Sequence, residues 1–329
     1  MTTNFEARLI DKDDYTGFET IYNDFKECAI SEYKFELPPV DYKDFLSAVE
    51  KDLIKCIVLF EDTIPSAFLI YTTSISEAIE LNIIHSYKME KVQERSRYLV
   101  KEFMRLTQTE RLDKVVCYPM LGSQKGLIDD IAQFGFKFIG IVVLRFLMYG
   151  TSSKDIMEAA EFPPIEENYK VVEWNEDYYG YAVDIIRDAF ENSADALFDP
   201  RFNSDKGVRD ILTKITENVY AEFLPAASSV LLYDDEPVGL CLMNLTGGNI
   251  ANIPIFGLKR AHQGKGLSKY MLKKSVQKLI DMADNSERPI TEVNTTTETN
   301  NFKALNMYRN IGFKEDYNYP QSYLPVKKY

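Results

Sequence analysis

The sequence predicts an α/β protein, more specifically an α+β mixed-sheet fold, made of two successive copies of one domain. The chain has 329 residues, which is enough for two domains of ordinary size. The same order of strand-like and helical segments occurs twice, and a polar segment with a Pro-Pro pair lies between the two occurrences. Duplication of a whole domain explains both observations.

Each copy is expected to open with a short strand followed by helices. The segments "FEARLIDKDDY" (residues 5–15) and "YKVVEWNEDYY" (169–179) both place acidic residues after a short β-rich run, where a helix begins. Apolar residues at helical spacing follow at 21–29 and at 182–190.

Two β-rich runs that turn back on themselves come next in each copy. The turn lies at 61–65 in the first copy and at 234–237 in the second. Acidic residues and a proline between runs rich in Val, Ile and Leu predict a β-hairpin in both places.

The later segments are also paired between the copies. The expected third strands, helices and fourth strands are 78–84 and 249–258, 97–107 and 267–284, and 114–118 and 291–296. A short helix then runs into Gly135-Phe136 and Gly312-Phe313, before a last strand. Hairpins followed by strand–helix–strand crossovers predict a mixed sheet with helices on both faces.

The segment at 149–170 is the expected connection between the copies. It is rich in small and acidic residues and contains Pro163 and Pro164, a composition typical of linkers. The predicted organisation is a first domain at 1–150, a linker at 151–167 and a second domain at 168–329.

The charge of the chain narrows the class of partner. The formal net charge is −13 and the pI is about 4.8. Such a protein repels phosphate backbones, so we expect no nucleic-acid partner. The same charge does not repel a cationic amine.

Cysteine and histidine usage indicates no metal site. The four cysteines lack Cys-x-x-Cys spacing and lie in or beside apolar runs, and the chain has two histidines. The first residues lack the basic and apolar regions of a secretory signal, and no apolar run reaches the roughly 18 residues of a membrane span. We therefore expect free thiols, a cytoplasmic location and no membrane partner.

The stretch "LKRAHQGKGLSKYML" (258–272) joins a β-rich run to a helical segment. Gly264 and Gly266 remove side chains and tolerate left-handed backbone angles where the helix begins. The first N–H groups of a helix are unpaired, and the helix dipole makes that end positive. Together with Lys265 and the hydroxyl of Ser268, this turn is predicted to bind a phosphate or diphosphate. A purely structural turn is the alternative.

Two motifs in the second copy resemble those of the GNAT acetyltransferase superfamily. "QGKGLS" resembles the family's Q/R-x-x-G-x-G/A acyl-CoA signature, with Gln263 first, Gly266 central and Ser268 in place of the final Gly or Ala. "NFKALNMYRNIGF" resembles the N-x-x-A-x-x-x-Y-x-x-x-G-F segment at five positions: Asn301, Ala304, Tyr308, Gly312 and Phe313. The resemblance covers residues 168–329.

The first copy resembles the same fold with its binding chemistry removed. Alignment on the helix places Ser96 over the central glycine, Tyr98 over the last small position, and Glu94 where a diphosphate would lie. Counting back from Gly135-Phe136 places three residues over the second motif, namely Gln124, Leu127 and Ile131 over Asn301, Ala304 and Tyr308. The chain therefore resembles a tandem GNAT protein with a degenerate, non-catalytic N-terminal copy.

The resemblance implies an N-acetyltransferase that binds acetyl-CoA in its second copy. It would transfer the acetyl group to a primary amine of a small molecule or an amino-acid-like metabolite, by direct attack in a ternary complex. The residues implied to contact the coenzyme are Ile255, Phe256, Gly257, Leu258, Gln263, Gly264, Lys265, Gly266, Leu267, Ser268, Asn301 and Tyr308.

Three residues are candidates for catalysis. Tyr308 is expected to protonate the departing thiolate, because a phenol with a pKa of about 10 suits that role; a core aromatic is the alternative. The resemblance implies that the strand before the glycine turn is splayed at about 255–258, and Pro254 and Gly257 are consistent with an irregular strand there. No Asp or Glu lies between Glu236 and Asp281, so this strand lacks the carboxylate base of many relatives. Glu292 and Glu298 are the remaining candidates, and a water chain to backbone carbonyls is the alternative to both.

The acceptor amine is expected to contact the loop at 191–207. Phe198, Asp199, Arg201 and Phe202 are its candidate substrate-binding residues. Asp199 would pair with an ammonium group and Arg201 with a carboxylate or phosphate. Ordinary packing of the loop is the alternative for all four.

Two other functions stay open on the sequence. Because an obvious base is missing, the chain is also compatible with a non-catalytic acyl-CoA-binding or regulatory module. A protein or peptide N-acetyltransferase is the third possibility.

Overall fold

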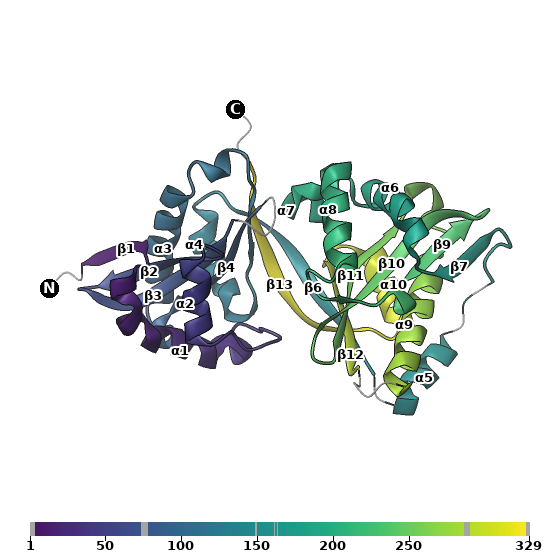
Figure 1. Ribbon diagram of the computed structural model, residues 1–329, viewed down its shortest axis with the longest axis horizontal. Helices are drawn as coiled ribbons and strands as arrows, with labels where there is room; N and C mark the ends of the chain where they lie inside the picture. The colour runs from purple at the N-terminus through teal and green to yellow at the C-terminus, as the bar shows by residue number, and fades with distance from the viewer. Residues whose placement is uncertain are drawn as a thin grey trace. The chain divides into compact units, whose positions relative to one another are not determined.

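The structure is a computed structural model, and it describes residues 4–73, 78–148, 150–160, 162, 164–285 and 290–326. The chain folds into two compact units (Figure 1). Unit 1 consists of Met1–Ile139, Leu197–Asp199 and Tyr319–Tyr329, and unit 2 consists of Gly140–Ala196 and Pro200–Asn318.

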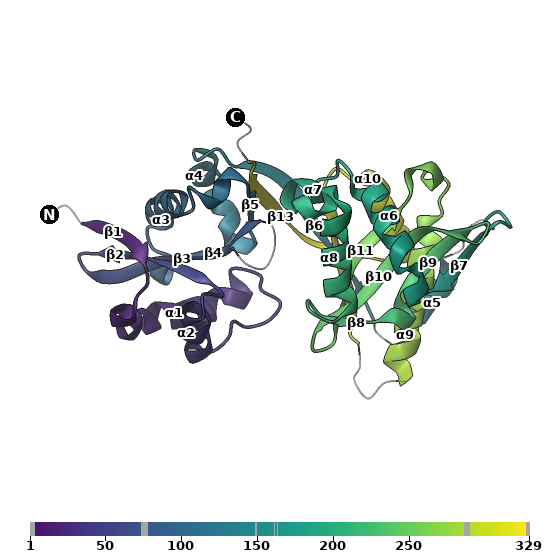
Figure 2. The ribbon, with the colours of Figure 1, turned by 45° about the horizontal axis from the view of Figure 1, so that its top comes forward.

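Unit 1 follows the predicted order of elements. Its elements in chain order are β1 (Phe5–Leu9), α1 (Tyr15–Ser31), α2 (Tyr42–Glu50), β2 (Lys55–Glu61), β3 (Ile64–Thr72), β4 (Ile79–Ser86), α3 (Val92–Leu106), β5 (Val116–Pro119), α4 (Ile128–Ala132) and the start of β6 (Lys137–Leu147). The sheet order is β1-β2-β3-β4-β5, with residues 321–324 of β13 (Lys314–Leu324) paired to β5. Figure 2 shows α1 and α2 on one side of this sheet and α3 on the other.

Unit 2 repeats this order. Its elements are the rest of β6, α5 (Gly150–Ala159), β7 (Tyr169–Glu173), α6 (Tyr179–Phe190), the start of α7 (Asp195–Phe198), α8 (Asp205–Thr216), β8 (Glu222–Phe223), β9 (Ser229–Tyr233), β10 (Glu236–Gly247), β11 (Ile250–Leu258), α9 (Ser268–Asn285), β12 (Glu292–Glu298), α10 (Phe302–Ile311) and the start of β13. The sheet order is β6-β12-β11-β10-β9-β7, with β8 beside β10. Side chains of α6 and α8 form the core on one face, and those of α9 and α10 form the core on the other.

Both predicted hairpins are present, and their turns share one backbone conformation. Asp62 and Thr63 between β2 and β3 have positive φ, as do Asp234 and Asp235 between β9 and β10. Two consecutive left-handed residues match the right-handed twist of the flanking strands. Aspartate tolerates this conformation better than most residues, which explains its place in both turns.

The last strands of the two copies differ from the organisation that the sequence suggested. Residues 140–147 of β6 belong to unit 2, where β6 pairs antiparallel with β12 from Leu147 opposite Glu292 to Ile141 opposite Glu298. Residues 319–329 belong to unit 1. The boundaries expected from the sequence, 1–150 and 168–329, place residues 140–147 in the first copy and residues 319–329 in the second. The structure has them the other way round. Alternating apolar residues reveal the faces of a strand but not its neighbours, so the pattern carried no signal for this exchange.

The segment expected as a linker at 151–167 contains a packed helix. Helix α5 spans ten residues, and Met157 is fully buried against the α9 side of the unit 2 core. Lys154 forms an ion pair with Asp284 of α9. Phe162 and Ile165 also pack against this core, and residues 161 and 163 lie outside the described part of the chain.

Unit 1 contains a buried polar network around His85 of β4. The His85 side chain is fully buried, with Nε2 3.0 Å from an Asp24 carboxylate oxygen and Nδ1 2.7 Å from the Tyr33 hydroxyl. A neutral ring that donates from Nε2 and accepts at Nδ1 satisfies both nitrogens. Burial lowers the pKa of His85 to about 4, although the Asp24 charge opposes this shift.

We predict that acid destabilises unit 1 through His85. The folded pKa lies below the ordinary value near 6.5, so between these values the unfolded chain binds more protons, and the free energy of unfolding falls as pH falls. The expected loss is about 2 kcal/mol between pH 7.5 and pH 5. Urea unfolding of the wild type and of His85→Gln at both pH values measures it. An equal loss in the two proteins would show that His85 is not the titrating group.

Candidate functional site

Strand β11 leaves the sheet of unit 2 along half of its length. Its parallel pairing with β12 runs from Ile250 opposite Glu292 to Asn252 opposite Asn294 and continues no further. Its pairing with β10 shifts by one residue, because Leu242 lies opposite Ile255 and Asn244 opposite Asn252. This is a β-bulge, at the position where Pro254 lacks a backbone donor. The irregular strand expected from the sequence is therefore present.

The residues beyond the bulge expose backbone groups on the side facing away from β10. Lys259 N–H donates to Val238 C=O at 2.9 Å, and bonded and non-bonded positions alternate along an antiparallel pair. Phe256 and Leu258 therefore direct their backbone groups away from β10. The Leu258 carbonyl accepts from the Gln263 side chain at 2.9 Å. Within the described residues, the outward N–H and C=O of Phe256 have no partner.

The turn after β11 presents a row of unpaired N–H donors. Gly264 and Gly266 both have positive φ, +80° and +73°. No acceptor in the described part of the chain bonds the N–H groups of residues 264–269, and residues 263–266 are exposed while Leu267 is buried in the core. The two left-handed glycines and the first turn of α9 therefore form a concave cluster of donors that suits a diphosphate.

Positive side chains surround this turn and are held in place by aromatic rings. Lys265 Nζ lies 3.1 Å from the Tyr169 hydroxyl, which is 2.8 Å from His262 Nδ1. Lys269 Nζ lies 4.5 Å from the centre of the Phe162 ring. Burial and the nearby lysine charges lower the pKa of His262, so its ring loses its proton at a lower pH than an ordinary histidine does. Lysine therefore supplies the charge beside the turn.

Tyr308 lies in the α9–α10 core with its hydroxyl near the splayed part of β12. It is 4% exposed and its ring centre is 6.4 Å from that of Phe256. Burial raises the pKa of Tyr308 well above its usual value, and a hydrogen bond with Thr295 opposes that shift. The phenol therefore stays protonated and is able to donate a hydrogen bond. Its ring also packs against Phe313 at 5.2 Å, so it serves the core as well.

Asn301 caps helix α10. Its side-chain oxygen accepts from Ala304 N–H at 3.2 Å, and its amide nitrogen donates to Thr297 at 3.2 Å. The side chain is exposed. The family motif thus coincides with an N-cap, which gives Asn301 a structural role whether or not it touches a ligand.

The two candidate bases differ in their surroundings. Glu292 begins β12 at the closed part of the sheet and forms an ion pair with Arg145, which also pairs with Asp316 at 2.8 Å. Glu298 ends β12 at the splayed part, and it forms no ion pair within the described residues. The geometry therefore favours Glu298 over Glu292 as a group able to take up a proton.

The four residues expected around the acceptor have different surroundings. Arg201 is buried and donates to Asp210 at 2.8 Å and to the Tyr220 hydroxyl at 2.9 Å, which ties its loop to α8. Phe202 stacks on Phe190 with ring centres 4.8 Å apart. Both residues are thus engaged in packing within unit 2.

Phe198 and Asp199 belong to unit 1. They line a cavity of about 230 Å³ together with Glu80, Asn82 and Cys117. The Cys117 thiol donates to the Phe198 carbonyl at 2.8 Å, and the Phe198 ring meets Tyr323. The sequence offered no sign of this placement, because Phe198 and Cys117 are distant along the chain.

Sequence reasoning missed Asp195 in the same loop. Burial is the main cause of the raised pKa of Tyr308, and the charge of Asp195 adds to it. Asp195 is exposed at the start of α7. Its position places a carboxylate within electrostatic reach of the candidate catalytic phenol.

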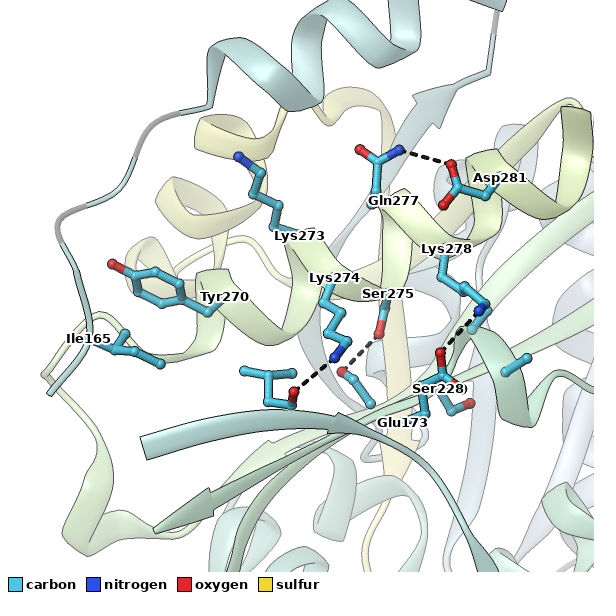
Figure 3. Close-up of a pocket in the computed structure, with 14 residues that line it drawn as sticks. Ile165, Glu173, Ser228, Tyr270, Lys273, Lys274, Ser275, Gln277, Lys278 and Asp281 are labelled. Carbon is cyan, nitrogen blue, oxygen red and sulfur yellow. Dashed lines mark hydrogen bonds and ion pairs between the residues drawn. The ribbon is translucent and has the colours of Figure 1, made fainter. Parts of the chain in front are cut away.

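A separate cavity of about 460 Å³ lies along α9 (Figure 3). Its polar side chains are already engaged, since Lys274 donates to the Val171 carbonyl, Lys278 pairs with Glu173 and Ser275 bonds Ser229. None of the residues predicted to bind coenzyme or acceptor lines it.

The described residues contain no cluster of three or more His, Cys, Asp or Glu side chains able to hold a metal ion. None of the described helices combines the length and the apolar character needed to cross a membrane.

Comparison with known proteins supports the sequence motifs. A model of the acetyltransferase (GNAT) family matches residues 186–313, which include the β11 strand, the glycine turn and Tyr308. No curated protein matches the sequence.

Solved structures match the whole two-unit chain. A GCN5-related N-acetyltransferase from Sphaerobacter thermophilus has a TM-score of 0.63 at 14% identity and covers 98% of this chain and 96% of its own. A tandem GNAT protein from the clavulanic acid biosynthesis pathway has a TM-score of 0.60 at 11% identity and covers 99% and 100%. The chain therefore has the fold of a tandem GNAT protein, as expected from the sequence.

We predict that Gly266→Glu abolishes binding of a diphosphate while preserving the fold. The new side chain adds a negative charge to the donor cluster at an exposed position with left-handed backbone. With ADP as the probe, we expect thermal stabilisation of the wild type and none of the variant. Gly180→Glu, on an exposed site of α6 with no neighbour within 4 Å, adds the same charge elsewhere. Equal stabilisation of all three proteins would contradict the assignment.

Proposed function

We propose that unit 2 transfers the acetyl group of acetyl-CoA to a primary amine, because a model of the GNAT acetyltransferase family matches residues 186–313. The proposed acceptor is a small molecule or an amino-acid-like metabolite. The observation that carries the proposal is the continuity of the open β11 edge with the unpaired N–H groups of residues 264–269. An extended ligand with amide groups at one end and a diphosphate at the other fits that surface.

The coenzyme would be held mainly by backbone groups. The edge of Ile255, Phe256, Gly257 and Leu258 would bind its amide-bearing arm, and the turn from Gln263 to Ser268 would bind the diphosphate. Lys265 and Lys269 add positive charge beside the turn. Such a site needs small residues and open backbone rather than many specific side chains.

The transfer requires deprotonation of the amine, stabilisation of the oxyanion and stabilisation of the departing thiolate. The neutral amine nitrogen attacks the thioester carbon, the negative charge develops on the carbonyl oxygen, and the carbon–sulfur bond breaks to release the thiolate. An ammonium acceptor must lose one proton before attack, and the nitrogen loses a second afterwards. A backbone N–H of the splayed part of β11 is proposed as the donor for the developing oxyanion.

Tyr308 is proposed to stabilise the departing thiolate. Its raised pKa keeps the phenol protonated at neutral pH. A phenol less acidic than the leaving thiol acts chiefly by donating a hydrogen bond, since complete proton transfer to the sulfur is then uphill. The Thr295 side chain forms a hydrogen bond with this hydroxyl.

The net charge of −13 favours a cationic acceptor over an anionic one. Glu298 is proposed as the group that accepts the amine proton, directly or through water. Free cysteines, three of them buried, are compatible with the reducing environment of the cytoplasm, which we propose as the location.

The proposed activity is tested by thiol release from acetyl-CoA against a panel of primary amines, with coenzyme binding measured in parallel. Turnover on a small amine supports the proposal. Tight binding without turnover on small amines or peptides would support the non-catalytic binding module instead.

Tyr308→Phe is expected to lower kcat by about 100-fold with little change in the Kd for acetyl-CoA. The ring and its packing are retained, and only the hydroxyl is lost. Steady-state kinetics and calorimetry separate the two effects. Tyr181→Phe on the exposed side of α6 serves as the control. A wild-type rate in Tyr308→Phe would remove this residue from the mechanism.

Glu298→Gln and Glu292→Gln are expected to behave differently. Glu298→Gln should lower kcat by about tenfold or more because a proton acceptor is lost. Glu292→Gln should leave kcat near the wild-type value and lower stability through the broken Arg145 pair. A lower kcat in Glu292→Gln than in Glu298→Gln would assign Glu292 as the base instead.

A further inference from the structure

The β4 strand of unit 1 is built like β11 of unit 2. Its parallel pairing with β5 covers Ile79 opposite Val116 and Glu80 opposite Cys117, and then ceases. Its pairing with β3 shifts by one residue, since Ile70 lies opposite Ile83 and Tyr71 opposite Leu81. Both strands thus carry one extra residue just after the last parallel pair. Counting from these bulges places Ile84 at the position of Phe256.

The outward backbone groups of Ile84 are not free. Gln124 Oε1 accepts from Ile84 N–H at 3.2 Å, and Gln124 Nε2 donates to Ile84 C=O at 3.0 Å. The Tyr118 hydroxyl also donates to Gln124 Oε1. The side-chain amide therefore forms, with one residue of β4, the pair of bonds that a neighbouring strand would form.

Gln124 is held firmly at this position. It is 2% exposed. The preceding Gly122 has φ of +51°, and a Cβ there would lie 2.0 Å from the Glu32 carbonyl oxygen. Ser123 N–H donates to the same carbonyl at 2.8 Å. The turn is thus fixed against the end of α1, and the amide reaches the β4 edge from a rigid support.

The turn after β4 differs from the glycine turn of unit 2 in the polarity that it presents. Arg95, 5% exposed, donates to the carbonyls of Tyr87 and Glu90 at 3.3 and 3.2 Å. It also pairs with Glu61 at 2.7 Å. The carbonyl oxygens of this turn are thus directed at the buried guanidinium of Arg95, and Glu94 adds a negative charge to the first turn of α3.

We propose that the splayed strand of unit 1 is an amide-binding site permanently occupied by the chain's own Gln124. The inference rests on the proposed function in one respect, since it takes the coenzyme amide to be the external ligand of the matching edge in unit 2. It goes beyond that function because it assigns unit 1 a formed recognition site for a primary amide. The chain consequently binds one molecule of acetyl-CoA.

Removal of the Gln124 amide tests the site directly. Gln124→Ala deletes four heavy atoms, and acetamide has four heavy atoms with the same carbonyl and amide groups. We expect a lowered Tm in Gln124→Ala and a rise of several degrees on addition of acetamide. Acetone, which has the same size and no N–H donor, should give a smaller rise.

Two matched variants complete the test. Gln133→Ala removes an exposed glutamine of the same unit, and acetamide should not raise its Tm. Gln124→Met fills the space without the two bonds to Ile84, so it should be destabilised and insensitive to acetamide. Equal effects of acetamide on Gln124→Ala and Gln133→Ala would overturn the proposal. Recovery of folded Gln124→Ala only in the presence of acetamide would support it.

Coenzyme stoichiometry separates this proposal from the proposed function. One acetyl-CoA per wild-type chain, lost in Gly266→Glu, supports both. Two per chain would overturn the occupied site. Acetamide rescue without any coenzyme binding would overturn the proposed function and support the amide site.

Discussion

The structure depends on how two parallel strands part from each other within a sheet. A backbone N–H or C=O inside a protein needs a partner, and a strand that leaves its neighbour creates a row of groups without one. In unit 2 the separation of β11 from β12 begins after Asn252. Water, another part of the chain or a ligand can supply the missing hydrogen bonds, so the gap is a candidate binding surface.

The two units meet this requirement in different ways. In unit 1 the amide of Gln124 bonds both groups of Ile84, and Arg95 fills the following turn. In unit 2 the edge of Phe256 and the N–H groups after Gly264 stay available to a ligand. One copy is therefore completed by its own side chains, and the other is proposed to be completed by the coenzyme.

Much of this architecture was predictable from the sequence, because its signals are local. The order of strands and helices follows from periodicity and turns, and Gly264 and Gly266 mark a left-handed turn at a helix start. The assignment of β6 to unit 2 and of the end of β13 to unit 1 was not predictable. The pattern of apolar residues along a strand does not indicate which strand pairs with it. The role of Arg201 was not predictable either, because it depends on the contact of its side chain with Asp210 of α8. The bond between Gln124 and Ile84 joins residues far apart in sequence, and it emerged only from the fold.

A crystal structure of the chain with acetyl-CoA tests the central claim most directly. The account predicts one coenzyme, with an amide of its arm bonded to the backbone of Phe256, its diphosphate on the N–H groups of residues 264–269, and the Gln124 amide still on Ile84. A coenzyme lying against β4 and Arg95, or an empty glycine turn at saturating acetyl-CoA, would contradict it.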